Sequence, residues 1–249
     1  MNIALILAAG MGRRMGTNTP KQFLEVGGKP ILAHTLDVFQ KHPEIDAIYV
    51  VCPEESRDMV WELVRDYEIS KLQKVIIGGK TRRESSYNGI RALEQVCGQK
   101  DIVLIHDGVR PNVTANTVHA NIVMAKAWGA CVTAVETSDT IVVCEDGRNL
   151  TSIPPRRFLW NVQTPQSFQY GVIRKAHDYY QEALDDGQEG LPEITDDTGL
   201  VLFMEEQMPC GQKVRICKGD PGNLKVTKPE DLRILLSILP QGEDGLGKP

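Results

Sequence analysis

The chain has 249 residues and a formal net charge of −5 at pH 7. Its length suits one α/β domain with a large buried core, and its acidic balance argues against binding to nucleic acid or to a membrane surface. No stretch approaches the ~20 apolar residues that cross a bilayer, and the N-terminal apolar run is too short for a signal peptide. The six cysteines are scattered without a C-x-x-C pair, which favours reduced thiols in a cytosolic protein. We therefore expect a cytoplasmic protein with one domain over residues 1–240 and a disordered Gly-rich tail at 241–249.

Short apolar runs predict buried parallel strands at residues 2–7, 47–52, 74–77, 102–105 and 130–135. Amphipathic patterns at helical spacing separate these runs, as at Leu32, Leu36 and Phe39. Strands that alternate with helices imply an α/β fold with a doubly wound, mostly parallel sheet. In such a sheet, ligands bind beyond the carboxyl ends of the strands.

One segment breaks this alternation. Residues 139–163 predict a β-hairpin with a turn at Asp146 and Gly147. A long excursion from a compact domain is usually functional or an interface, and an isolated two-stranded ribbon is marginal in water. We therefore expect this arm to pack against a second subunit, and a long surface loop is the alternative.

The glycine-rich loop after the first predicted strand carries the strongest functional signal. Gly10, Gly12 and Gly16 let the backbone pass close to a ligand, so that its N–H groups can face phosphate oxygens. Arg14 and Lys21 add positive charge where a triphosphate would lie. The spacing matches neither the dinucleotide pattern G-x-G-x-x-G nor the P-loop pattern. A plain strand-to-helix turn is the alternative, against which the two cations argue.

Further polar clusters follow the third and fourth predicted strands, where the fold would place a site. Gly78, Gly79 and Ser85 suit backbone and hydroxyl contacts to a base, ribose or phosphate. His106 is more readily explained as hydrogen-bonded structure than as a metal ligand, because no set of His, Cys and carboxylate residues has zinc spacing. No Ser has the G-x-S-x-G setting of a nucleophile elbow. The chemistry implied is electrostatic, with cations placed around phosphates.

Several blocks of sequence, taken in order, carry a more specific resemblance. They are Ala8-Ala9-Gly10-x-Gly12-x-Arg14-Met15-Gly16, Pro20-Lys21-Gln22, Gly78-Gly79-x-x-Arg82-x-x-Ser85, His106-Asp107-x-x-Arg110-Pro111, Asp139-Thr140-Ile141, Gln163-Thr164-Pro165-Gln166, Thr195-Asp196-Asp197 and Asn223-Leu224-Lys225. Together they resemble the 2-C-methyl-D-erythritol 4-phosphate cytidylyltransferases of the non-mevalonate isoprenoid pathway. The resemblance implies a Rossmann-like nucleotidyltransferase fold with a protruding β-arm that forms a homodimer.

The same resemblance implies roles for residues at matching positions. The implied catalytic residues are Arg14, Lys21, Arg156 and Lys225. The implied CTP-binding residues are Ala8, Ala9, Gly10, Gly12, Gly78, Gly79, Arg82 and Ser85. The implied contacts to the polyol phosphate are Asp107, Arg110, Thr140, Thr164 and Thr195. Thr140, Arg156 and Thr164 would act across the dimer interface, and Mg²⁺ would bridge the CTP phosphates with no side chain assigned to it.

Some positions resemble instead the sister family of ribitol-5-phosphate cytidylyltransferases. Val109, Glu136 and Pro154 favour that family, whereas Ala9 and Asp197 favour the methylerythritol phosphate family. We expect methylerythritol phosphate to be the acceptor and keep D-ribitol 5-phosphate as the alternative. A nucleotide-binding module without catalytic activity is a third hypothesis, and the retained arginines and lysines argue against it.

Overall fold

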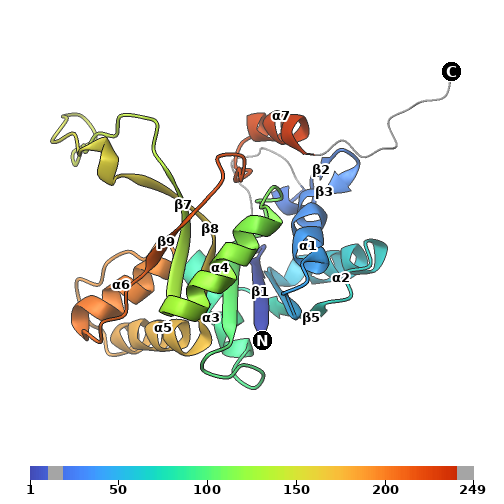
Figure 1. The fold of residues 1–249 in the computed structure, drawn as a ribbon, viewed down its shortest axis with the longest axis horizontal. Helices are drawn as coiled ribbons and strands as arrows, with labels where there is room; N and C mark the ends of the chain where they lie inside the picture. Colours follow the sequence, from blue (N-terminus) through green and yellow to red (C-terminus); the bar gives the residue numbers. More distant parts are fainter. Residues whose placement is uncertain (11–18, 240–249) are drawn as a thin grey trace.

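A seven-stranded sheet forms the centre of the molecule in the computed structural model, which describes residues 1–10 and 19–239 (Figure 1). Its strands are β1 (Asn2–Leu7), β4 (Ala47–Cys52), β5 (Leu72–Ile77), β6 (Ile102–Asp107), β7 (Ala130–Glu136), β8 (Trp160–Gln169) and β9 (Arg215–Lys218). They lie in the order β5-β4-β1-β6-β8-β7-β9. Strand β8 runs antiparallel to both of its neighbours, and the other pairs are parallel. The predicted α/β fold with a mostly parallel sheet is confirmed.

Helices cover both faces of the sheet. Helices α1 (Ile31–Lys41), α2 (Arg57–Asp66) and α4 (Ala115–Trp128) pack on one face. Helices α3 (Arg82–Ala92), α5 (Tyr170–Asp185) and α6 (Asp197–Gln207) pack on the other. Strand β1 shows the reason, because successive side chains point to opposite faces and all of them are buried. Ala4 and Ile6 join the first cluster, while Ile3 and Leu5 join the second.

A smaller apolar cluster lies beyond the carboxyl ends of the parallel strands. Here helix α7 (Pro229–Ile238) packs near the short ribbon of β2 (Glu25–Val26) and β3 (Lys29–Pro30) (Figure 1). Leu235, Val26 and Val109 are buried against one another in this cluster. The C-terminal segment is thereby held beside the loop that follows β6, and Lys225 lies in that segment.

Strands β8 and β9 are missed by the sequence analysis for a physical reason. Strand β8 contains a proline and is rich in polar residues, so no apolar run marks it. Its buried polar side chains are hydrogen-bonded instead: Ser167 Oγ donates to Asn121 Oδ1 at 3.0 Å. Strand β9 has only four residues, of which Cys217 alone is buried.

The predicted arm protrudes from the sheet after β7 (Figure 1), although its end differs from the expected one. Residues 160–163 belong to β8, and residues 160–162 pair with β7, so they lie in the central sheet. Along residues 137–159, all of which the structure describes, the two sides share one β-bridge, between Val143 and Ser152, and at the base of the arm the Thr137 N–H donates to Leu159 O. At the turn, Asp146 Oδ1 accepts the N–H groups of Arg148 and Asn149. The arm is therefore an irregular loop with one β-bridge and not the regular β-hairpin that the sequence predicts.

Every helix in the described part of the chain is too short or too polar to span a bilayer. The predicted tail at 241–249 lies outside the described residues, as do Gly12 and Arg14.

Candidate active site

A pocket of about 940 Å³ lies over the carboxyl ends of β1, β4, β5 and β6. This is where an open parallel sheet leaves a crevice between the loops that follow its strands. Ten of the predicted site residues line it: Ala8, Ala9, Gly10, Lys21, Gly78, Gly79, Arg82, Ser85, Asp107 and Lys225. The structure therefore brings together residues from both ends of the chain around one cavity.

One wall of the pocket is backbone held close to a helix start. A Cβ added at Gly78 would lie 2.8 Å from Ser85 Oγ and 2.9 Å from Ala9 Cβ, so only glycine fits there. The Ser85 hydroxyl donates to Thr81 O at 2.9 Å and accepts the Gly79 N–H at 3.1 Å. Thr81 is the N-cap of α3 and accepts the Glu84 N–H. Ser85 thus fixes the loop that a nucleotide would meet, which suits its predicted place in the CTP site.

Asp107 is the charged centre of the pocket. Lys225 Nζ lies 2.9 Å from its Oδ2, Arg110 Nε donates to the same oxygen at 3.3 Å, and Arg82 Nε lies 3.8 Å from its Oδ1. Burial opposes ionisation of this carboxyl, but the facing charges of Lys225, Arg82 and Arg110 outweigh it and lower the pKa of Asp107. The carboxylate is therefore ionised and orients the cations around it.

Two predicted substrate contacts lie behind Asp107 and do not line the pocket. Arg110 is 9% exposed, and its Nη1 donates to Asn223 O at 2.7 Å. Thr164 is buried in β8, where its Oγ1 accepts the Asp107 N–H at 3.1 Å. Both hold Asp107 in place, and their predicted contact with the polyol phosphate stays a prediction.

His106 confirms the structural interpretation made from the sequence. The ring is fully buried, with Nδ1 2.9 Å from Thr164 Oγ1 and Nε2 3.1 Å from Arg110 O. Burial lowers the pKa of His106 to about 4, so the imidazole is neutral at pH 7. The ring thereby supports Arg110 and Thr164, the two residues that hold Asp107 in place.

Lys21 also lines the pocket. It begins a short 3-10 helix (Lys21–Phe23), and its Nζ donates to Val226 O at 3.1 Å. The segment that carries Lys225 therefore also holds Lys21, which places two lysines on the same pocket. Gly12 and Arg14, which complete the predicted phosphate-binding loop, lie outside the described residues.

The remaining predicted residues lie away from the pocket of their own chain. Thr140 and Arg156 are exposed on the arm, where Arg156 Nη2 donates to Thr140 Oγ1 at 3.3 Å. Thr195 is exposed just before Asp196, the N-cap of α6. None of the three lines the pocket.

Sequence reasoning misses several residues that do line the pocket. Gln22 is 1% exposed, and its Nε2 donates to Ala8 O at 2.9 Å, which fixes the first loop. Glu54 and Glu55 follow β4, and Lys80 follows β5. The rule that ligands meet the carboxyl ends of parallel strands could have identified the last three.

Acidic and imidazole side chains in the described ranges, 1–10 and 19–239, form no group of three that could hold a metal ion. Both oxygens of Asp107 face cations, so this carboxylate is engaged.

A glycine-walled pocket at the carboxyl edge of a doubly wound sheet, with lysines and backbone N–H groups around it, defines a nucleotide-binding α/β enzyme. Comparison with known proteins makes the class specific. The family model of 2-C-methyl-D-erythritol 4-phosphate cytidylyltransferase matches residues 2–241. The chain belongs to this family.

Individual relatives and a solved structure are similar to this chain over most of its length. A 2-C-methyl-D-erythritol 4-phosphate cytidylyltransferase of Geobacter metallireducens is 44% identical over 92% of this chain and 93% of its own length. A ribitol-5-phosphate cytidylyltransferase of Streptococcus agalactiae is 35% identical over 96% of this chain and 95% of its own. The solved 4-diphosphocytidyl-2C-methyl-D-erythritol synthase of Anaerococcus prevotii has a TM-score of 0.78 at 30% identity, covering 95% of this chain and 94% of that one. The fold is thus of the nucleotidyltransferase type.

Proposed function

We propose that this chain transfers CMP from CTP to the phosphate of 2-C-methyl-D-erythritol 4-phosphate and releases pyrophosphate. The observation that carries the proposal is the family match over residues 2–241, with seven of the eight predicted CTP-binding residues lining one pocket. A phosphate oxygen of the acceptor attacks the α-phosphorus of CTP, and the bond from that phosphorus to the pyrophosphate oxygen breaks. The second pKa of a phosphate monoester is about 6, so the attacking oxygen is already anionic at pH 7 and needs no general base.

The chain's own contribution is position and charge. Lys21 and Lys225 face the pocket, where they would neutralise the negative charge that builds up on the phosphates. Asp107 fixes Lys225 at 2.9 Å, so the ammonium group is preorganised for this task. The backbone from Gly78 to Lys80 lines the pocket, where its N–H and C=O groups would read a pyrimidine base.

Mg²⁺ is part of the proposal as an ion carried by the nucleotide. It would add positive charge along the triphosphate when bound. The ion-paired state of Asp107 supports this arrangement, because this buried carboxylate of the pocket already has cationic partners. Calorimetric titration of CTP with and without Mg²⁺ tests it: the ion should tighten CTP binding, and Mg²⁺ alone should give no heat of binding.

A homodimer is also part of the proposal, with the arm of each subunit reaching the pocket of the other. Two observations support it. Thr140 and Arg156 do not line the pocket of their own chain. Large apolar side chains are exposed along the arm, and Phe158 is 67% exposed. The others are Ile141, Val142, Leu150 and Ile153. We place the enzyme in the cytoplasm, where CTP is available.

Pyrophosphate release from CTP with a panel of polyol phosphates tests the function. The proposal requires release with 2-C-methyl-D-erythritol 4-phosphate and a product of the mass of the cytidine diphosphate derivative. The relative from Streptococcus agalactiae makes D-ribitol 5-phosphate the competing acceptor to include. Release with neither acceptor would reject the proposed function.

A further inference from the structure

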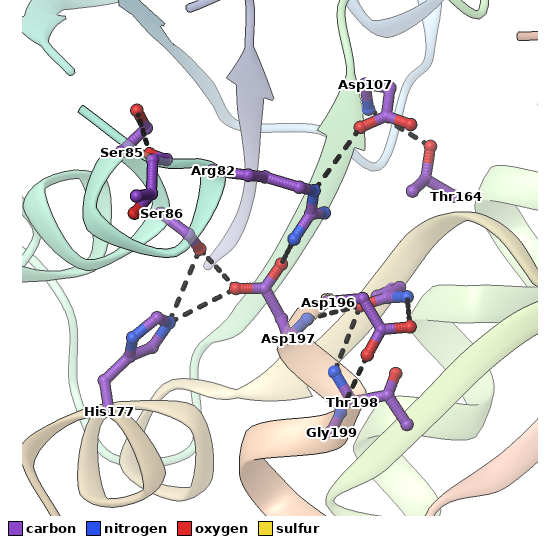
Figure 2. Close-up of polar contacts among 12 residues, drawn as sticks. Arg82, Ser85, Ser86, Asp107, Thr164, His177, Asp196, Asp197, Thr198 and Gly199 are labelled. Atoms are coloured by element: carbon purple, nitrogen blue, oxygen red, sulfur yellow. Dashed lines mark hydrogen bonds and ion pairs between the residues drawn. The ribbon is translucent and has the colours of Figure 1, made fainter. Parts of the chain in front are cut away.

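A buried polar cluster beside the pocket centres on Asp197, the first residue of α6 (Figure 2). Asp197 is 1% exposed, and both of its oxygens are engaged. Arg82 Nη1 lies 2.8 Å from its Oδ2. On the other side, Oδ1 accepts hydrogen bonds from the hydroxyl of Ser86 and from His177 Nε2, the latter at 3.2 Å. Neither Asp197 nor His177 lines the pocket, whereas Arg82 does.

The backbone of Asp197 is also fixed by hydrogen bonds. Gln166 Oε1 accepts the N–H groups of Asp197 and Thr198 at 3.0 and 3.1 Å, and Gln166 Nε2 donates to Asp196 Oδ2. Asp196 in turn caps α6 by accepting the Gly199 N–H. Rotation about the side-chain bonds of Asp197 is therefore the main freedom left to its carboxylate.

Ser86 and His177 remove that freedom. A carboxylate only accepts hydrogen bonds, so His177 Nε2 carries the hydrogen in this contact. His177 Nδ1 is buried without a hydrogen-bond partner, and a proton there would have no acceptor. The ring therefore acts as a fixed donor to Asp197 through Nε2. Burial opposes ionisation of Asp197, but the charge of Arg82 and the hydrogen bonds from His177 and Ser86 outweigh it and lower the pKa of Asp197.

Arg82 connects Asp197 to the pocket. Its guanidinium bridges the two carboxylates, with Nη1 on Asp197 and Nε 3.8 Å from Asp107 Oδ1 (Figure 2). Asp107 in turn holds Lys225. A change at His177 would therefore reach the pocket lysine through Asp197, Arg82 and Asp107. Four elements, α5, α6, α3 and β6, supply the members of this chain of contacts before the C-terminal segment.

We propose that His177 and Ser86 are positioning residues of this enzyme: they orient Asp197, which sets the direction of Arg82 and so the placement of Asp107 and Lys225. The proposal deepens the proposed function and rests on it. Small misplacements of a preorganised charged group are costly to rate, on the order of 10-fold or more. His177 therefore matters for turnover although it lies behind the pocket wall.

The test compares variants of His177 in the full-length enzyme. His177→Phe removes the donor and keeps a ring, and we expect kcat/KM for CTP to fall by about 10-fold or more. His177→Gln places an amide donor near the position of Nε2 and should recover most of the loss. Tyr170→Phe is the matched control, because it removes a buried hydroxyl that joins α5 to Ile90 of α3 away from Asp197. Its kcat/KM should stay within about twofold of wild type.

A double-mutant cycle separates positioning from a general structural role. If His177 acts through Asp197, adding His177→Phe to an Asp197→Asn background should cost less than about twofold further. Additive losses, or a folded His177→Phe enzyme with wild-type kcat/KM, would overturn the proposal. Should His177→Phe not fold, Ser86→Ala carries the same cycle through the other donor.

The calorimetric Kd of CTP provides a second readout for the same variants. A wild-type enzyme that binds CTP but turns over no acceptor would reject the proposed function. The positioning role would then be decided by whether His177→Phe weakens CTP binding in the wild-type background but not in the Asp197→Asn background. Equal weakening in both backgrounds would overturn it.

Discussion

Lys225 Nζ and Asp107 Oδ2 lie 2.9 Å apart, which joins the C-terminal segment to the end of β6 at the pocket. Asp107 also forms ion pairs with Arg110 of the loop that follows β6 and with Arg82 of α3. One carboxylate therefore organises cations from three separate parts of the chain.

Lys225→Ala and Lys21→Ala should each lower kcat by on the order of 10²–10³-fold, the usual cost of removing one preorganised charge from a transition state. Lys225→Arg should retain part of the rate, because the charge remains beside Asp107. Lys41→Ala is the control, since Lys41 is a surface lysine paired with Asp37. Steady-state kinetics of the folded variants decide the matter, and a near-normal kcat in both alanine variants would mean that the phosphates bind elsewhere.

CTP should be used much better than ATP or GTP, because Ala9, Gly78 and Gly79 form one wall of the pocket, where backbone groups would read the smaller pyrimidine base. Gly78→Ala should weaken CTP binding as well, since the new Cβ would meet Ser85 Oγ at 2.8 Å. Competition titrations against CTP give the relative affinities. Comparable turnover with ATP would contradict this assignment of the base site.

Arm exchange between subunits should restore activity to a mixture of two inactive variants. In a dimer of Lys21→Ala and Arg156→Ala chains, one of the two sites has both residues intact. Free exchange should therefore recover about one quarter of wild-type activity, because half of the dimers are mixed and each has one good site.

A mixture of two Lys21→Ala preparations should show no recovery, which controls for instability of the variants. A protein that is monomeric by light scattering, or exchange without recovery, would rule out an arm that completes the partner's site.

His106 should make stability depend on pH in a defined window. Its pKa is about 4 in the folded protein because of burial, whereas an unfolded histidine has a pKa of about 6.5. Between these values the unfolded state binds more protons, so the free energy of unfolding falls as pH drops from about 6.5 to about 4.

Replacing His106 by Gln should remove up to about 1.4 kcal/mol per pH unit of that slope. Urea unfolding of the wild type and of the His106→Gln variant at several pH values measures this slope. An unchanged slope in the His106→Gln variant would contradict the buried neutral state.

The parts of the site that follow predicted strands could be found from sequence, because the carboxyl ends of parallel strands share one edge. Gly78, Gly79 and Asp107 are of this kind, and the structure places them on one pocket. Lys225 is different, since no local pattern marks its contact with a carboxylate far away in the chain. Only the resemblance to a family could assign it.

Other features escaped the sequence analysis because tertiary contacts define them. Strand β8 has buried polar side chains in place of an apolar run, so its existence depends on partners such as Asn121. His177 lies on an amphipathic helix, where its ring would ordinarily be taken for core packing. Its bond to Asp197 requires two helices to meet, which periodicity cannot reveal.

The ratio of kcat/KM for 2-C-methyl-D-erythritol 4-phosphate to that for D-ribitol 5-phosphate, with CTP saturating, tests the proposed function most directly. A site shaped for one polyol leaves buried polar groups unpaired with the other, which costs about 1–3 kcal/mol for each group. We predict a ratio of at least about 10 in favour of the methylerythritol phosphate. A ratio of similar size in favour of ribitol 5-phosphate would contradict the assigned acceptor and leave the cytidylyl transfer itself in place.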